Sequence, residues 1–305
     1  MHIDGYVEPT KEVKMSVIFT KDVRVGNKRS KVSVECFNSA DECARECEKR
    51  SITSSSFDDM RKKARANWHG ATYGEAMNLL KNGYQATVEA LRNVFNASVG
   101  TGKRFRFNNN VIGFAPVVPL ALMGVPNSMI DMHMTPIKAK VVDVYFDMTC
   151  RCSTTSEQIM EASKKILSAV IELERQGYRF NLYSCTSFFN STSGDIMCIK
   201  VKSAEQPLDL KRISFSMAHT AFFRVLGFDW YSKFPIGTYR GGYGHAAYFE
   251  FEKGGVQDMY KQVFGKSNIV FFSAQQMIDR GNDVKTIKEI LENNSNNNSK
   301  KEGAR

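Results

Sequence analysis

Residues 138–189 are KAKVVDVYFDMTCRCSTTSEQIMEASKKILSAVIELERQGYRFNLYSCTSFF, where the strand and helix patterns of the sequence are clearest. It opens on an apolar, β-branched run at 138–148, the composition of a strand that is buried on both faces. A polar loop follows, and apolar residues then recur at helical spacing over 157–176, which predicts a helix. Gly177 ends that helix, and YRFNLYSCTSF supplies a second strand. The stretch therefore predicts a strand, a helix and a strand in succession.

The same alternation continues towards the C-terminus. The sequence predicts a strand at 195–203, a long helix at 208–228 that Gly227 ends, a short helix at 256–264, a strand at 268–276 and a helix at 283–292. Strands that alternate with helices predict an α/β domain: a mainly parallel sheet in three layers, with helices on both faces.

The chain before this domain is divided differently. Two short β-rich runs at 13–20 and 31–37, with a reversal signal at Gly26-Asn27, predict a β-hairpin or two edge strands. A small helical region follows, in which Thr72 and Glu75 form a capping box. The glycine- and proline-rich segment 100–136 is too apolar for a solvated linker, so we expect it to lie against the core.

Four regions result from this division. They are 1–56, an N-terminal hairpin and helix; 57–136, a helical and Pro/Gly-rich connecting region; 137–293, the α/β domain; and 294–305, a low-complexity polar tail that we expect to be disordered.

Composition excludes several classes of protein. The chain has 305 residues, a formal net charge of +10 and 42% hydrophobic residues, which argues against wholesale disorder. No run approaches the 18 or so consecutive apolar residues of a membrane span, and the first residues lack the apolar region of a secretory signal. We therefore expect a cytoplasmic protein with no membrane partner. Seven cysteines, an odd number, argue against a disulfide framework.

The end of the first strand carries a motif of its own. Asp147, Thr149 and Arg151 stand where a D-x-S-x-S pattern would place its Asp and two hydroxyls, and Ser153 follows. The strand, the hydroxyl-rich loop and the long helix resemble the opening of a von Willebrand factor A (vWA) domain, a three-layer, Rossmann-like fold. The resemblance implies a divalent cation, here Mg²⁺, held by Asp147, Thr149 and Ser153, with Thr186 as a further candidate. Arg151 argues against it, because an arginine would bring positive charge to a ligand position. The alternative is a degenerate motif with no cofactor.

A second resemblance lies upstream. The pattern W-x-G-x-T-x-x-E-A-x-x-x-L-x-x-G at 68–83, followed by V-x-G-x-x-P-x-V-P-x-x-L-x-G-x-P at 111–126, is similar to uncharacterised proteins of tailed phages and prophages. The resemblance covers roughly 65–250. It implies a phage-type protein in the bacterial host cytoplasm, and it implies no activity.

The net charge is concentrated in one segment. Residues 61–110 contain nine Lys and Arg against two Glu, which is +7 of the +10. Alternating basic and aromatic residues in this segment could hold phosphates and stack bases, but a half-buried strand shows the same alternation. The nucleic-acid hypothesis rests on seven of these residues: Arg61, Lys62, Lys63, Arg65, Lys103, Arg104 and Arg106.

No pattern of catalytic residues stands out. The segment 97–104 lacks the first glycine and the final hydroxyl of a phosphate-binding loop, and the histidines form no known motif. The sequence therefore favours a non-enzymatic module that binds another protein through the loops 147–156, 186–193 and 239–245. The alternative is a nucleic-acid-binding protein that uses 61–106.

Overall fold

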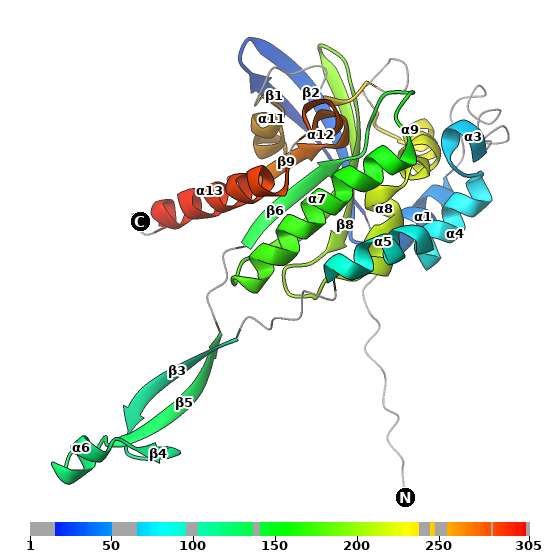
Figure 1. Ribbon diagram of the computed structural model, residues 1–305. Helices are drawn as coiled ribbons and strands as arrows, with labels where there is room; N and C mark the ends of the chain where they lie inside the picture. The colour runs from blue at the N-terminus through cyan, green and yellow to red at the C-terminus, as the bar shows by residue number, and fades with distance from the viewer. Residues whose placement is uncertain are drawn as a thin grey trace, which may run out of the picture.

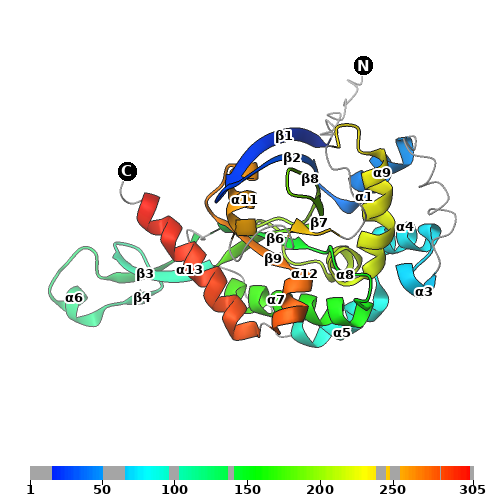
Figure 2. The same cartoon turned by 90° about the horizontal axis from the view of Figure 1, so that it is seen from above.

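A six-stranded sheet forms the centre of the molecule (Figure 1). The computed structural model describes residues 16–50, 66–95, 103–136, 141–237, 245–247, 255–281 and 283–302. The strand order is β1-β2-β8-β7-β6-β9. One face of the sheet is covered by a layer of helices that includes α7 and α8, and the sheet curls around α11 on its other face (Figure 2). The predicted α/β class, with helices on both faces, is confirmed.

The stretch 138–189 forms the predicted unit. Strand β6 (Val141–Asp147), helix α7 (Ser156–Arg175) and strand β7 (Arg179–Phe189) follow one another, and β6 pairs in parallel with β7. Helix α7 begins in a capping box: the side chain of Thr155 accepts from Gln158 N, and the Gln158 side chain accepts from Thr155 N. Gly177, at φ 98°, lets the chain turn back into β7.

The sheet is mixed, with three parallel and two antiparallel strand pairs. Strand β8 (Ser193–Lys202) runs antiparallel to β7, whereas β9 (Ile269–Ser273) runs parallel to β6. Only residues 190–192 separate β7 from β8, and a parallel pair needs a connection of a dozen or more residues. The short connection therefore forces a hairpin.

The N-terminal hairpin is part of this sheet. Strands β1 (Val17–Val25) and β2 (Lys28–Phe37) pair as predicted around Gly26, which has φ 60°. Strand β2 then pairs in parallel with β8. The hairpin extends the sheet by two strands.

Helices from the N-terminal region pack with α7 and α8 against the same face of the sheet and form part of the larger core. Helix α1 (Ala40–Lys49) follows β2, and α3 (Ala66–His69), α4 (Tyr73–Asn82) and α5 (Gln85–Phe95) lie between the hairpin and β6 in the sequence. The predicted Thr72–Glu75 capping box is present with both of its hydrogen bonds. Apolar residues of α1, α4, α7 and α8 (Leu210–Ala218) pack together in one core, and residues facing α11 (Gly255–Phe264) form a second.

The predicted helix at 208–228 is broken and longer than expected. Helix α8 ends at Ala218, a π-helix η1 (Phe222–Gly227) follows, and α9 (Phe228–Lys233) continues beyond Gly227. Gly227 keeps helical angles, and an added Cβ would lie 3.1 Å from the Thr186 side chain. The glycine therefore serves close packing against β7 and does not end the helix.

Residues 103–136 form an arm that projects from the body (Figure 1). Strands β3 (Lys103–Asn110), β4 (Ala115–Pro116) and β5 (Met129–Pro136) make a separate sheet in the order β3-β5-β4, with helix α6 (Val118–Leu122) at its tip. The expectation that this segment lies against the core is wrong. Its strands pair with one another, so the segment needs no strand of the main sheet as a partner and can leave the core.

The C-terminal elements follow β9. Helix α12 (Ala274–Arg280) ends at Gly281 in the left-handed conformation, and α13 (Val284–Glu302) packs against α7. Helix α13 extends through most of the stretch 294–305 that we expected to be disordered. Asn and Ser each weaken a helix by only a few tenths of a kcal/mol, and no glycine or proline interrupts it before Gly303. Within the described residues, no helix combines the length and apolarity that a membrane span requires.

Candidate functional site at the strand ends

Asp147 ends β6 in the middle of the sheet and is completely buried. Its Oδ1 accepts a hydrogen bond from Thr149 N at 3.0 Å, and its Oδ2 accepts one from Ser187 Oγ at 2.5 Å. Both oxygens of the predicted ligand are therefore engaged by the protein itself.

Thr149 and Ser187 close this network. Thr149 Oγ1 donates to Ser187 O at 3.1 Å and accepts from Ser187 N at 2.8 Å, so the side chain ties the loop to β7. Ala247 N donates to Ser187 Oγ at 3.0 Å. The sequence analysis placed Ser187 in the candidate loop 186–193 but did not pair it with Asp147. The parallel register places Asp147 beside Cys185, two residues before Ser187 on the adjacent strand, which brings the two side chains together.

Burial dominates the ionisation of Asp147. It raises the pKa of the carboxyl to about 6, while the hydrogen bonds from Ser187 and Thr149 act in the opposite direction. A carboxyl with this pKa holds its proton more tightly than an exposed aspartate does.

The residues at this strand end do not fit a divalent cation. Asp147 and Thr149 are brought together but are committed to each other and to Ser187, whereas Ser153 lies exposed on the loop. Thr186 is buried on β7, and its Oγ1 has no hydrogen-bond partner among the described residues. Nowhere in the described ranges do three or more His, Cys, Asp or Glu side chains gather as metal ligands would. Mg²⁺ usually takes an octahedral set of oxygens, including water, which this closed arrangement does not offer.

Arg151 turns away from Asp147. Its Nη1 lies 3.2 Å from Oδ1 of Asp279 on α12. The loop is also held at its backbone, because Gln275 Oε1 accepts from Arg151 N at 2.9 Å and from Thr154 Oγ1 at 3.1 Å. The arginine therefore anchors the loop to α12 rather than entering a ligand position.

Arg224, in the π-helix η1, holds the other side of the loop. It is 4% exposed, and its guanidinium donates to four backbone carbonyls. Nη1 donates to Trp68 O at 2.8 Å, and Nη2 donates to the carbonyls of Arg151, Cys152 and Thr154 at 2.9, 3.1 and 2.7 Å. Its burial lowers the pKa of the guanidinium from the usual value. The sequence prediction missed Arg224, since one arginine in an apolar helix carries no pattern.

Trp68 lies on this support with part of its ring in solvent. The guanidinium carbon of Arg224 is 4.7 Å from the ring centroid, and Trp68 Nε1 donates to Cys152 O at 2.9 Å. The ring of Trp68 also packs edge-on against His69 and is tilted against Phe228. The residue remains 40% exposed. An exposed aromatic ring in a fixed position thus stands beside the loop 148–155. We call Trp68 and this loop the strand-end surface.

The other two predicted loops are described in part. The segment 186–193 consists of the end of β7 and a turn, in which Asn190 Oδ1 accepts from Thr192 N and Ser193 N. Residues 239–244 lie outside the described ranges. His245 is described, and its carbonyl accepts from Phe189 N at 2.8 Å, which places 245–247 against the end of β7.

The predicted basic residues are described in part as well. Arg61, Lys62, Lys63 and Arg65 lie outside the described ranges. Lys103, Arg104 and Arg106 lie on β3 of the arm, opposite Pro136, Thr135 and His133 of β5.

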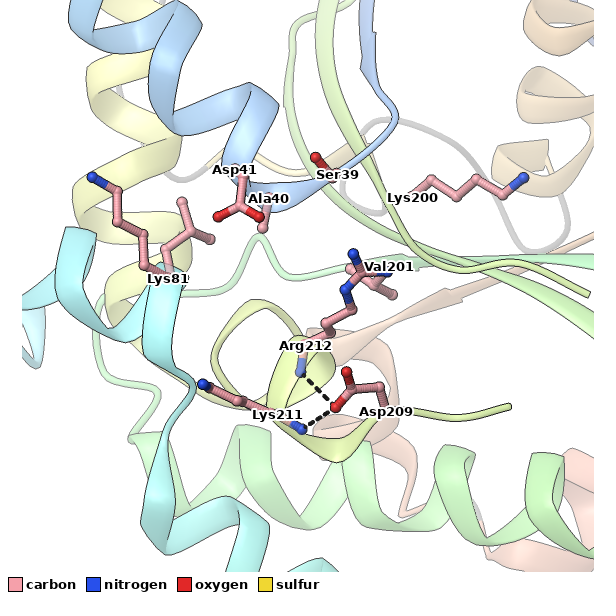
Figure 3. A pocket seen from close by; sticks show the side chains of 10 residues that line it. Ser39, Ala40, Asp41, Lys81, Lys200, Val201, Asp209, Lys211 and Arg212 are labelled. Carbon is pink, nitrogen blue, oxygen red and sulfur yellow. Dashed lines mark hydrogen bonds between the residues drawn. The ribbon is translucent and has the colours of Figure 1, made fainter. Parts of the chain in front are cut away.

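A hollow of about 200 Å³ lies elsewhere, between α1, α4, β8 and α8 (Figure 3). Four cationic side chains line it, together with two carboxylates: Lys81, Lys200, Lys211, Arg212, Asp41 and Asp209. Asp209 caps α8 by accepting from Lys211 N and Arg212 N. Asp41 also points into the space that Arg212 enters. The two carboxylates offset half of the positive charge, so the hollow is a poor candidate for anion binding.

His219 and two of the cysteines are titratable groups buried away from the strand-end surface. His219 is 5% exposed, its Nδ1 accepts from Ala221 N at 3.1 Å, and burial lowers its pKa to about 4. All seven cysteines are free. Cys185 and Cys198 face each other across β7 and β8, and burial is the largest cause that raises the pKa of each thiol.

Comparison with known proteins gives one match. A family model described as "Domain of unknown function (DUF7192)" matches residues 11–295. No curated protein matches the chain, and no solved structure does.

Proposed function

We propose that this chain, which belongs to the DUF7192 family, is a non-enzymatic protein-interaction module of phage type that acts in the bacterial cytoplasm. In this proposal its domain is a degenerate vWA-like fold, and another protein binds at the strand-end surface. The phage assignment and the compartment rest on the resemblance of the motifs at 68–83 and 111–126.

The observation that carries the proposal is the position of Trp68. Tryptophan and arginine are enriched among the residues that dominate protein interfaces, and a ring that is already fixed loses little entropy on binding. Arg224 fixes both the ring of Trp68 and the adjacent loop through four carbonyls. The molecule thus presents a rigid aromatic group near the carboxyl-terminal ends of the strands, where ligands of open α/β sheets usually bind.

The degenerate motif supports the same proposal. A vWA-like domain that binds through a cation would keep Asp147 open to solvent. Here Asp147 is buried, and both of its oxygens accept hydrogen bonds from Thr149 and Ser187. The strand end is therefore suited to contacts made by its surface side chains rather than by a metal.

Affinity capture tests the proposal. The full chain is immobilised and exposed to lysate from infected or expressing cells, with and without nuclease. We expect a protein that is still retained after nuclease treatment. The Trp68→Ala variant should bind this protein with an affinity at least tenfold lower than that of the wild type. Val141→Ala is the matched control, because Val141 is 41% exposed and lies at the opposite end of β6. Retention by Trp68→Ala at the wild-type level would overturn the proposal.

The alternative function is nucleic-acid binding through 61–106. It is supported by the concentration of +7 in residues 61–110 and by the position of three of the basic residues on the projecting strand β3. In this case nuclease would remove the captured material. Direct binding would weaken steeply with salt, and Lys62→Ala or Arg104→Ala would lower the slope by about one. Absence of binding to DNA and RNA at about 50 mM salt would exclude this alternative.

A further inference from the structure

The arm 103–136 ends in a surface of exposed apolar side chains. Its tip comprises the β3–β4 connection, β4, α6 and the start of β5 (Figures 1 and 2). Of the twelve large apolar side chains that are exposed among the described residues, seven lie here: Val111, Ile112, Phe114, Val118, Leu122, Met123 and Met132. We call these seven the arm tip. Ile112 and Leu122 are 81% and 83% exposed, which is unusual for residues of this size in one short segment.

The backbone beneath the arm tip is well defined. Phe114 N donates to Ile130 O at 2.9 Å, and Val117 N donates to Ser128 O at 2.7 Å. Gly113 lies so close to the Ile130 carbonyl that any side chain at this position would collide with it. The apolar side chains therefore stand on an ordered backbone. Because that backbone is ordered before binding, less conformational entropy of the arm is lost when a partner binds.

The area of the arm tip matches that of a protein interface. The seven side chains together expose roughly 800 Å² of apolar surface, about what each partner contributes to an interface of standard size. A surface of this size is costly to leave in water, because its burial is favourable in proportion to its area.

Charge decides which partner fits. Between residues 107 and 136 the only charged side chain is Asp131, and Asn110 Nδ2 donates to it at 3.3 Å. In a two-fold contact each patch faces a copy of itself, so a patch with a net charge would repel its copy. On a chain of net charge +10, a self-associating patch must therefore be nearly neutral. The arm tip meets this requirement. It offers no cation for a phosphate, and the arm contains no Trp or Tyr, the residues that are enriched where proteins enter a membrane interface.

We propose that the arm tip is a self-association surface, on which the arm tip of a second copy of this chain packs about a two-fold axis. Each tip covers the exposed apolar area of the other, and the contact joins the two chains at their arms. This surface is separate from the strand-end surface, because Figures 1 and 2 both place the arm on the far side of the sheet from α3.

Sedimentation velocity on the full chain tests this proposal. Between about 1 and 100 µM, a range in which standard interfaces form, we expect the wild type to sediment as a dimer of the 34.4 kDa chain. The double variant Ile112→Asp/Leu122→Asp places charges in the contact and is expected to be monomeric throughout. Both positions are exposed, so its circular dichroism should equal that of the wild type, and it should melt slightly below the wild type because it lacks the stabilisation that the dimer provides. Val17→Asp, at a position 57% exposed on β1, is the matched control and should remain dimeric.

Three results would overturn the proposal. They are a wild type that is monomeric throughout this range, a double variant that still dimerises, and a dimer that Val17→Asp dissolves. A monomeric wild type that floats with phospholipid vesicles would assign the arm tip to a membrane instead. Trp68→Ala should remain dimeric, so failure of this proposal and failure of the proposed function are distinguishable.

Discussion

At the residue scale, Asp147 and Arg224 show how polar groups are handled beneath the strand ends. Asp147 is buried with two hydrogen-bond donors, Thr149 N and Ser187 Oγ, and no cation within the described residues pairs with it. Arg224 is buried with four carbonyl acceptors. Each charge is stabilised by neutral hydrogen-bonding groups. Removing one of these groups would leave a buried charge without a partner and would lower the stability of the fold.

Asp147 makes stability depend on pH. Its pKa is about 6 in the folded protein, against 3.8 for an ordinary aspartate, so the folded protein binds the proton more tightly than the unfolded chain. The carboxyl therefore contributes stability below about pH 4 that is lost as the pH rises through 6. We expect the free energy of unfolding of the wild type, relative to Asp147→Asn, to fall by about 2 kcal/mol between pH 4 and 7. Urea denaturation at each pH measures this difference.

His219 provides the control for that measurement. Its pKa is lowered from 6.5 to about 4, so the neutral ring contributes stability above about pH 6.5 that is lost as the pH falls through 4. Relative to His219→Gln, the wild type should therefore become less stable towards acid, the opposite slope. A difference between wild type and Asp147→Asn that stays constant with pH would contradict the burial of an ionisable Asp147.

At the scale of elements, local signals predicted some structures and not others. The capping box at Thr72 and the helix after Thr155 could be predicted, because caps and helical spacing are local. The antiparallel β8 was predicted as a strand but not in its direction, although the three-residue connection 190–192 carried that information. The break after Ala218 could not be predicted, since it depends on how η1 packs against β7 and the loop after β6.

The residues of the candidate site were likewise predictable only in part. Asp147 and Thr149 follow a recognisable motif, and the sequence placed them correctly at a strand end. Ser187 and Arg224 come from other elements and meet the loop only after the sheet and helices have packed. The arm was predicted wrongly for a related reason: composition shows that a segment is apolar, but not whether its apolar side chains face its own core or another molecule.

The hydrogen bonds of Arg224 connect η1 to the loop after β6, and their contribution to stability can be measured. Arg224→Met leaves four carbonyls without their donor, and we expect it to lower the free energy of unfolding by about 3 kcal/mol. Arg212→Met is the matched control, because Arg212 is exposed and should change stability by less than about 0.5 kcal/mol. Thermal or urea denaturation compares the two. An Arg224→Met variant as stable as Arg212→Met would show that these hydrogen bonds do not hold the loop.

At the scale of the whole molecule, the two proposed surfaces lie far apart. The strand-end surface lies beside α3, and the arm tip lies on the opposite side of the sheet (Figure 1). A chain with these two surfaces could associate with its own copy at one and hold a different protein at the other. The net charge of +10 belongs mainly to residues 61–110, and the distal arm beyond Arg106 is almost free of charge.

Iodide quenching of tryptophan fluorescence shows whether another protein covers Trp68, as we propose. The chain has two tryptophans, of which Trp230 is 0% exposed and Trp68 is 40% exposed, so iodide should quench Trp68 selectively without any mutation. Saturation with the captured partner should abolish the quenchable fraction and shift the emission of Trp68 to shorter wavelength. Quenching that is unchanged when the partner is fully bound would contradict the account.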